Sequence, residues 1–198
     1  MSSEAKVTFV TSNKGKAREV EWIFKRNGLP LKVFYSETVE IQSEEISTIA
    51  VFRAMQAYTM LRRPVFVEDA GLFINCLGGF PGPFSSYVYR TVGLRNLLKM
   101  LEGEERSAYF KSAVCYYDGV SAPRLFEGVC HGQIASKPSG TKGFGFDPIF
   151  IPKGKTKTFA EMSSEEKNAV SHRGVSVNKL CRWLYKVRQQ AKEGRKNG

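Results

Sequence analysis

The stretch VTFVTSNKGKAREVEWIF, residues Val7–Phe24, decides how the chain begins to fold. Val7–Val10 is a short apolar run that predicts a buried strand, and the polar segment TSNKGK follows almost at once. Asn27-Gly28 then ends a helical pattern. The apolar face of that predicted helix consists of Ala17, Val20, Ile23 and Phe24. We therefore expect a strand, a polar loop and a helix in this order.

This layout makes the start of the helix a candidate anion site, because helix N-termini carry free N–H groups and a partial positive charge. The loop adds hydroxyl and amide donors and lysine charges to that site. An ordinary helix cap with solvated lysines is the alternative. The chain has no G-x-x-x-x-G-K-[ST] motif, which excludes a P-loop. The candidate phosphate-binding residues are Thr11, Ser12, Asn13, Lys14, Gly15 and Lys16.

Further along, strand and helix patterns first alternate and then pair locally. This order predicts an α/β fold with a mixed sheet. The uncharged run Ala70–Tyr89 is rich in glycine and proline, so we interpret it as a loop and not as a membrane-spanning helix. The other predicted strands are Leu31–Tyr35, Val65–Val67 and an antiparallel pair, Ala108–Tyr117 with Leu125–Ile134. The other predicted helices are Glu45–Leu61, Gly93–Leu101 and a last one whose apolar face is Leu180, Trp183, Leu184 and Val187.

Composition sets the outer limits. The 198 residues favour one domain, here residues 1–190 followed by a basic C-terminal tail, 191–198. A net charge of +11 attracts polyanions without choosing among them. The N-terminus MSSEAKVTFV has no signal-peptide pattern. The four cysteines contain no C-x-x-C pair, which indicates reduced thiols in a cytoplasmic protein.

Carboxylates follow the predicted strand Val65–Val67. If the strand breaks into a turn there, Glu68 and Asp69 can face one site, where two acids repel each other unless a cation lies between them. A magnesium ion (Mg2+), which prefers oxygen ligands and substrate phosphates, meets that need. A turn acid with a helix cap is the alternative. Glu40, in an acidic patch, looks by itself like part of a solvated face.

Two segments nearer the C-terminus carry further polar side chains. In SGTKGFGFDPIF, residues 139–150, flexible backbone places two rings beside Asp147, as needed to grip something flat and polar. In SSEEKNAVSHRG, Ser163 and Glu166 form a capping box. Lys167, His172 and Arg173 follow there, and a charged helix end is the alternative interpretation. His172 beside an arginine is expected to stay neutral at pH 7, and His131, in a predicted strand, is expected to be structural.

Taken together and in this order, TSNKGK, VEDAGL, LGGFPGPFS, TKGFGFDPIF and EMSSEEKNAVSHRG resemble the inosine triphosphate pyrophosphatase family. The resemblance implies magnesium-dependent hydrolysis of ITP, dITP and XTP to the monophosphate and pyrophosphate. It also implies an elongated α/β homodimer with the site in a cleft between two lobes. The partner it implies is a purine nucleoside triphosphate, with no membrane and no specific nucleic acid.

The same resemblance implies roles for individual residues. Thr11, Asn13 and Lys16 are implied to bind the triphosphate. Glu40 and Glu68 are the implied metal ligands, with Asp69 as proton acceptor or second metal ligand. The residues implied around the base and phosphates are Phe144, Gly145, Phe146, Asp147, Lys167, His172 and Arg173.

Two positions depart from the family pattern. Ala70 stands where many members have serine, and Arg53 stands where some members have lysine, so both are substrate-binding candidates with altered chemistry. Two other functions stay open at this point. One is a Maf-type pyrophosphatase with other nucleotides, and the other is a basic nucleic-acid-binding protein that stacks bases on its aromatic side chains.

Overall fold

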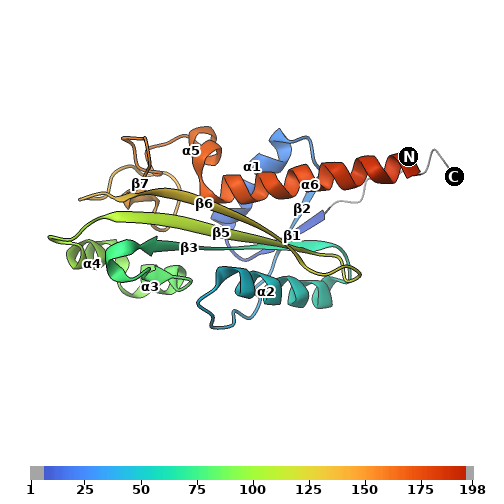
Figure 1. Ribbon diagram of the computed structural model, residues 1–198, viewed down its shortest axis with the longest axis horizontal. Helices are drawn as coiled ribbons and strands as arrows, with labels where there is room; N and C mark the ends of the chain where they lie inside the picture. The colour runs from blue at the N-terminus through green and yellow to red at the C-terminus, as the bar shows by residue number, and fades with distance from the viewer. Residues whose placement is uncertain (1–6, 195–198) are drawn as a thin grey trace.

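The computed structural model describes residues 7–194, and parts of the N-terminal and C-terminal predictions lie outside this range. The first six residues of MSSEAKVTFV and the last four of the basic tail are among them. The chain forms an elongated mixed sheet of seven strands with helices on both faces (Figure 1). Helices α1, α5 and α6 lie on one side of the sheet, and α2, α3 and α4 lie on the other (Figure 1). The predicted α/β class is confirmed.

The strand order is β2-β1-β3-β5-β6-β7, and β4 pairs with β3. Strand β1 runs parallel to both β2 and β3, whereas β3, β5, β6 and β7 pair antiparallel. The strands are β1 Val7–Thr11, β2 Leu31–Tyr35, β3 Val65–Ile74, β4 Pro81–Gly82, β5 Ser107–Tyr117, β6 Arg124–Ile134 and β7 Phe150–Pro152. The helices are α1 Lys14–Arg26, α2 Ile46–Leu61, α3 Ser85–Thr91, α4 Gly93–Met100, α5 Ser164–Val170 and α6 His172–Gly194.

Hydrophobic packing divides the molecule into two lobes along the long strands. One lobe joins α3, α4 and β7 to the far ends of β3, β5 and β6, around Leu97, Phe150 and Phe159. The other lobe packs α1 and α6 on one face of the sheet, around Phe24 and Leu180, and α2 on the opposite face. The predicted face of α1 is confirmed, because Ala17, Val20, Ile23 and Phe24 are all buried.

Three predictions of local structure were wrong. Ala70–Tyr89 is not one loop: its start belongs to β3, and it contains most of α3. The strand predicted as Val65–Val67 continues to Ile74, because β5 pairs with it over its whole length. Val187 is 40% exposed and does not belong to the buried face of α6, which ends its packing near Leu184. Helix α6 also includes the first residues of the predicted tail.

Among the described helices, none combines the length and the apolar character needed to cross a membrane.

Candidate active site

A cavity of about 410 Å³ opens between the two lobes. The N-terminal lobe supplies the loop before α1, and the other lobe supplies α3 and the segment around Asp147. The predicted site residues that line it are Thr11, Ser12, Asn13, Lys16, Glu40, Arg53, Ala70, Phe144, Gly145, Phe146, Asp147, His172 and Arg173. The predicted residues outside the lining are Lys14, Gly15, Glu68, Asp69 and Lys167.

The loop before α1 is organised by its own side chains. Asn13 is the N-cap of α1, and its Oδ1 accepts hydrogen bonds from the N–H groups of Gly15 and Lys16 at 2.8 and 3.0 Å. Thr11 is buried, and its Oγ1 accepts a hydrogen bond from the Asn13 N–H. Two of the free N–H groups expected at this helix start are therefore already satisfied, which leaves side-chain donors and Lys16 facing the cavity.

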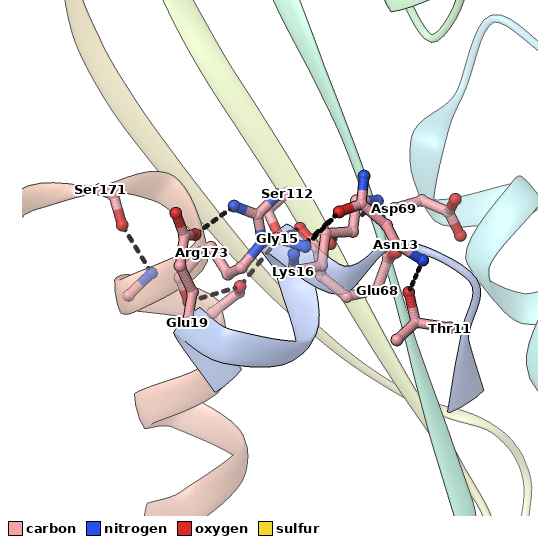
Figure 2. A network of polar contacts seen from close by, with 12 residues as sticks. Thr11, Asn13, Gly15, Lys16, Glu19, Glu68, Asp69, Ser112, Ser171 and Arg173 are labelled. Atoms are coloured by element: carbon pink, nitrogen blue, oxygen red, sulfur yellow. Dashed lines mark hydrogen bonds and ion pairs between the residues drawn. The ribbon is translucent and has the colours of Figure 1, made fainter. Parts of the chain in front are cut away.

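Glu68 lies at the centre of a buried polar network beneath the cavity (Figure 2). Its carboxylate is 3.0 Å from Lys16 Nζ and 3.2 Å from Arg173 Nε, and it accepts a hydrogen bond from Ser112 Oγ at 2.7 Å. Burial alone would raise the pKa of the Glu68 carboxyl, but Arg173 and Lys16 hold it below its ordinary value. Glu68 is therefore ionised, and Lys16 and Arg173 are fixed at the wall of the cavity.

Asp69 has different neighbours. Its carboxylate pairs with Arg53 of α2, whose guanidinium also lies 3.2 Å from Glu40 and donates to Thr38 Oγ1 at 2.7 Å. Burial raises the pKa of the Asp69 carboxyl in spite of Lys16 and Arg53. Its Oδ2 is buried without a hydrogen-bond partner. Asp69 is thus a buried carboxylate that binds a proton more tightly than an exposed aspartate does.

The expectation that the strand breaks at Glu68 and Asp69 was wrong. Both residues lie inside the ladder of β3 with β5, opposite Val114 and Ala113. The strand that ends here is β1, whose pairing with β3 stops at Phe66. The loop before α1 occupies the space beyond the end of β1. The predicted site therefore lies beyond the carboxyl end of β1 and beside β3.

The two phenylalanine rings of the segment SGTKGFGFDPIF lie in different environments. Phe144 lines the cavity and packs on the backbone of Gly15, where an added Cβ would lie 2.5 Å from the ring. Phe146 is 4% exposed and packs into the core of its lobe, edge-on to Tyr89. Lys167 Nζ and Arg173 Cζ lie 5.1 and 5.4 Å from the centroid of the Phe144 ring, so this ring stands at the cavity wall beside two cations.

Asp147 is anchored inside its own lobe as well as lining the cavity. Its Oδ2 accepts hydrogen bonds from the Phe144 N–H and from Lys167 Nζ, at 2.8 and 2.6 Å. Burial raises the pKa of the Asp147 carboxyl, against the effect of Lys167. Lys167 also donates to Glu19 at 2.6 Å, so its ammonium is held between two acids.

His172 and Arg173 begin α6. The His172 ring stacks on Phe110 with centroids 4.5 Å apart, and its Nδ1 has no hydrogen-bond partner. Burial, helped by the charge of Arg173, holds the pKa of His172 well below its ordinary value, so the predicted neutral imidazole is confirmed. Arg173 donates to Glu19 at 2.5 Å as well as facing Glu68. His131 lies on an exposed position of β6, away from the cavity lining.

Sequence reasoning missed two groups of residues at the site. Glu19 looked like one more charge on the polar face of α1, yet it joins Lys167 to Arg173. Its position three residues after Lys16 on a helix was the signal that could have placed it near the site. Helix α3 was missed because its segment resembled a loop. The residues beyond the predicted set that line the cavity are Ser85, Ser86, Tyr89, Arg90 and Phe110.

Comparison with known proteins agrees with this arrangement. Residues 7–183 match the model of the Ham1 family. This chain belongs to the Ham1 family. A relative from Hyperthermus butylicus, named dITP/XTP pyrophosphatase, is 50% identical over 91% of this chain and 96% of its own. One of the same name from Pyrococcus horikoshii is 47% identical over 90% of this chain and 96% of its own.

Solved structures of Ham1 proteins have the same fold. The HAM1 protein from Coxiella burnetii superposes with a TM-score of 0.80 at 29% identity, over 92% of this chain and all of that one. The Ham1 protein of Staphylococcus aureus gives 0.75 at 27% identity, over 90% and 98% of the two chains. The resemblance to the inosine triphosphate pyrophosphatase family, with its two lobes and central cleft, is therefore confirmed, and neither a Maf-type enzyme nor a nucleic-acid-binding protein is favoured.

The acids of this Ham1 chain have the chemistry that Mg2+ requires. Asp69 Oδ2 is buried without a hydrogen-bond partner behind the cavity lining, and Glu40, which shares Arg53 with Asp69, lines the cavity. Oxygen ligands of this kind suit magnesium. Arg53 now lies against both Glu40 and Asp69, and Glu68 faces Lys16 and Arg173. A cation at this position would take over charge compensation that protein cations now provide.

Proposed function

We propose that this chain hydrolyses dITP, XTP and ITP to the nucleoside monophosphate and pyrophosphate, and so removes nonstandard purines from the nucleotide pool. The observation that carries the proposal is the cavity itself, which brings the loop before α1 and the segment around Asp147 together. The acids of β3 lie behind its lining, where Glu68 pairs with Lys16 and Asp69 with Arg53. The names of relatives at 47–50% identity support the substrate class.

The triphosphate lies along the loop before α1, where Asn13 and Lys16 provide a side-chain donor and a charge. Water attacks the α-phosphorus, the bond to the bridging oxygen breaks, and pyrophosphate leaves. Asp69 accepts the proton of that water, a role that its raised pKa supports. Lys16 offsets charge on the leaving group, held in place by Glu68.

Magnesium would supply positive charge to the phosphate oxygens, with Glu40 and Asp69, which share Arg53, as the acids that would hold it. Glu68 lies on the other face of β3 and instead holds Lys16 and Arg173. The base lies against Phe144, on which a flat purine can stack. Asp147 and His172 also line the cavity and can provide polar groups for the base edge. Hypoxanthine and xanthine carry an oxygen at C6 and a proton on N1, whereas adenine carries the opposite pattern.

We further propose that the active form is a homodimer and that it works in the cytoplasm. The described cysteines are all free thiols, and burial raises the pKa of Cys115 and Cys181 to about 12. Such thiols suit a reducing compartment. Light scattering on the purified chain tests the dimer, since a monomeric mass with full activity contradicts it.

The deciding experiment measures pyrophosphate release from dITP, XTP, ITP, ATP and GTP, with magnesium and with EDTA. We expect release from the first three nucleotides, at a rate at least about a hundredfold above ATP, because mismatched buried polar groups cost about 1–3 kcal/mol each. EDTA should abolish release and added magnesium restore it. Release of orthophosphate in place of pyrophosphate, or equal rates on all five nucleotides, would contradict the proposal.

A further inference from the structure

We propose that Arg90 of α3 binds the phosphate chain of the substrate from the lobe opposite the loop before α1. This inference rests on the proposed function and extends its binding site to a helix that the sequence pattern did not reveal. Arg90 lines the cavity together with Ser86 and Tyr89 of the same helix. Ser86, Tyr89 and Arg90 stand at i, i+3 and i+4 on one face of α3, so they face the cavity as a group.

Helix α3 is held firmly enough to place such a side chain. Ser85 Oγ accepts a hydrogen bond from the Leu72 N–H and donates one to the Gly82 carbonyl, both at 2.7 Å. Val88 is buried in the core of the lobe. The ring of Tyr89 packs edge-on against Phe146, with centroids 5.6 Å apart. The helix is therefore tied to β3 and to the base-binding segment while Arg90 stays exposed.

The charges around the cavity single out Arg90. The other lining cations already face carboxylates of the protein: Lys16 with Glu68, Arg53 with Asp69 and Glu40, and Arg173 with Glu19 and Glu68. Among the described residues, Arg90 forms no ion pair. Its Nε contacts the Ser86 carbonyl of its own helix at 3.4 Å, a long and weak hydrogen bond.

A triphosphate brings several negative charges into a cavity whose protein acids already balance most of the protein cations. Such a ligand needs a cation that is not already paired with a carboxylate of the protein. The planar guanidinium of arginine matches the geometry of phosphate oxygens. Because Arg90 reaches the cavity from the lobe opposite Lys16, the two cations can hold the phosphate chain from both sides. The ligand chemistry is that of a polyphosphate and does not involve the base edge.

Binding of inorganic tripolyphosphate, measured by calorimetry at fixed magnesium, tests this assignment on the whole chain. The variants are Arg90→Gln, Arg90→Lys and the control Arg95→Gln, which removes an exposed arginine of α4 outside the cavity. We expect Arg90→Gln to weaken tripolyphosphate binding about tenfold or more, equivalent to about 1.4 kcal/mol. Arg90→Lys should recover part of that loss, and Arg95→Gln should bind like wild type.

Kinetics on dITP and XTP separate this inference from the proposed function. Arg90→Gln should raise KM for both substrates by a similar factor and leave the XTP-to-ATP ratio of kcat/KM unchanged. If Arg90→Gln and Arg95→Gln bind tripolyphosphate equally, or if the variant changes base preference while its tripolyphosphate affinity is intact, Arg90 does not bind phosphate. If the wild-type chain hydrolyses none of these nucleotides, the proposed function fails, and the tripolyphosphate comparison still decides the role of Arg90.

Discussion

Glu68 and Asp69 are neighbours in the chain but lie on opposite faces of β3. Glu68 faces α6, where it pairs with Arg173, and it accepts a hydrogen bond from Ser112 of β5. Asp69 faces α2, where it pairs with Arg53. Side chains of successive strand residues point to opposite faces, and β3 continues through both positions. The charge of Lys16 acts on both carboxylates, but they pair with different arginines and have opposite pKa shifts, so they can perform separate tasks.

Replacing Asp69 by asparagine should reduce kcat about 10²–10⁴-fold, the range for removal of a general base. The fold should persist, because Arg53 keeps Glu40 and Thr38 as partners. Steady-state kinetics on XTP and a thermal melt are the measurements. Glu37→Gln, on an exposed residue outside the cavity, is the control and should be fully active. More than a tenth of wild-type kcat in Asp69→Asn would remove Asp69 from the catalytic step.

Glu19→Gln should lower the free energy of unfolding at pH 7 by about 3 kcal/mol, since it leaves Lys167 and Arg173 short of a buried partner. Burial would raise the pKa of Glu19, but Arg173 and Lys167 hold it below its ordinary value of 4.5. The stability from Glu19 is thus complete above pH 4.5 and is lost as the pH falls through the lowered pKa.

The gap between wild type and Glu19→Gln should therefore shrink below pH 4.5. Urea unfolding of both proteins from pH 7 down to pH 3.5 measures this stability difference. The range reaches roughly 1 pH unit below the ordinary pKa of glutamate, where the difference begins to shrink. Glu165→Gln is the matched control, because its pair with Arg26 is exposed and should be worth less than about 1 kcal/mol. A gap that stays constant with pH would mean that packing, and not charge, explains the loss.

Phe144 and Phe146 should respond differently to truncation. Phe144→Ala should lower kcat/KM for XTP and ATP by a similar factor, because stacking does not distinguish the base edges. Phe146→Ala should cost about 3–5 kcal/mol of stability, as expected for a phenylalanine removed from a core. Kinetics and urea unfolding on both variants test the pair. A selective loss with XTP in Phe144→Ala would assign base reading to this ring.

Gly15→Ala should impair the enzyme without unfolding it. Alanine favours a helix over glycine by about 1 kcal/mol, but its Cβ would lie 2.5 Å from Phe144 Cδ1. The ring must then move from the backbone of α1. We expect a KM for XTP at least about fivefold higher, with a melting temperature no lower than that of wild type. An unchanged KM would show that the ring position is not needed for binding.

Arginine 173 is a poor site for testing base recognition, although its sequence context suggests that use. Arg173 is 2% exposed and pairs with Glu19 and Glu68, so Arg173→Leu would leave two buried carboxylates short of a cation. His172→Phe is the sharper test, because phenylalanine keeps the stack on Phe110 and removes the ring nitrogens.

If His172 reads the C6 oxygen, His172→Phe should narrow the XTP-to-ATP ratio of kcat/KM about tenfold or more, the effect of one lost buried hydrogen bond. The comparison needs both substrates at the same magnesium concentration. A ratio that stays within about twofold of wild type would move base recognition to backbone groups or to Asp147.

The sequence by itself determined the elements whose signals are local. The strand, loop and helix at Val7–Phe24 and the capping box of Ser163 and Glu166 follow from contiguous residues and their spacing. The long β5–β6 pair was also predictable, because its two strands follow one another along the chain. Such features depend on side-chain periodicity and turn chemistry within a few residues.

Only the tertiary structure decided how the site is assembled. Whether β3 stops after Val67 or continues depends on β5, some forty residues later in sequence, and this pairing separates Glu68 from Asp69. The link from Glu19 to Lys167 and Arg173 joins residues 148 and 154 positions apart. Helix α3, hidden in a glycine- and proline-rich segment, forms because Ser85 and Val88 find partners on β3 and in the core of that lobe. Contacts between segments that are distant in sequence follow from packing in three dimensions, and the local periodicity of the sequence does not predict them.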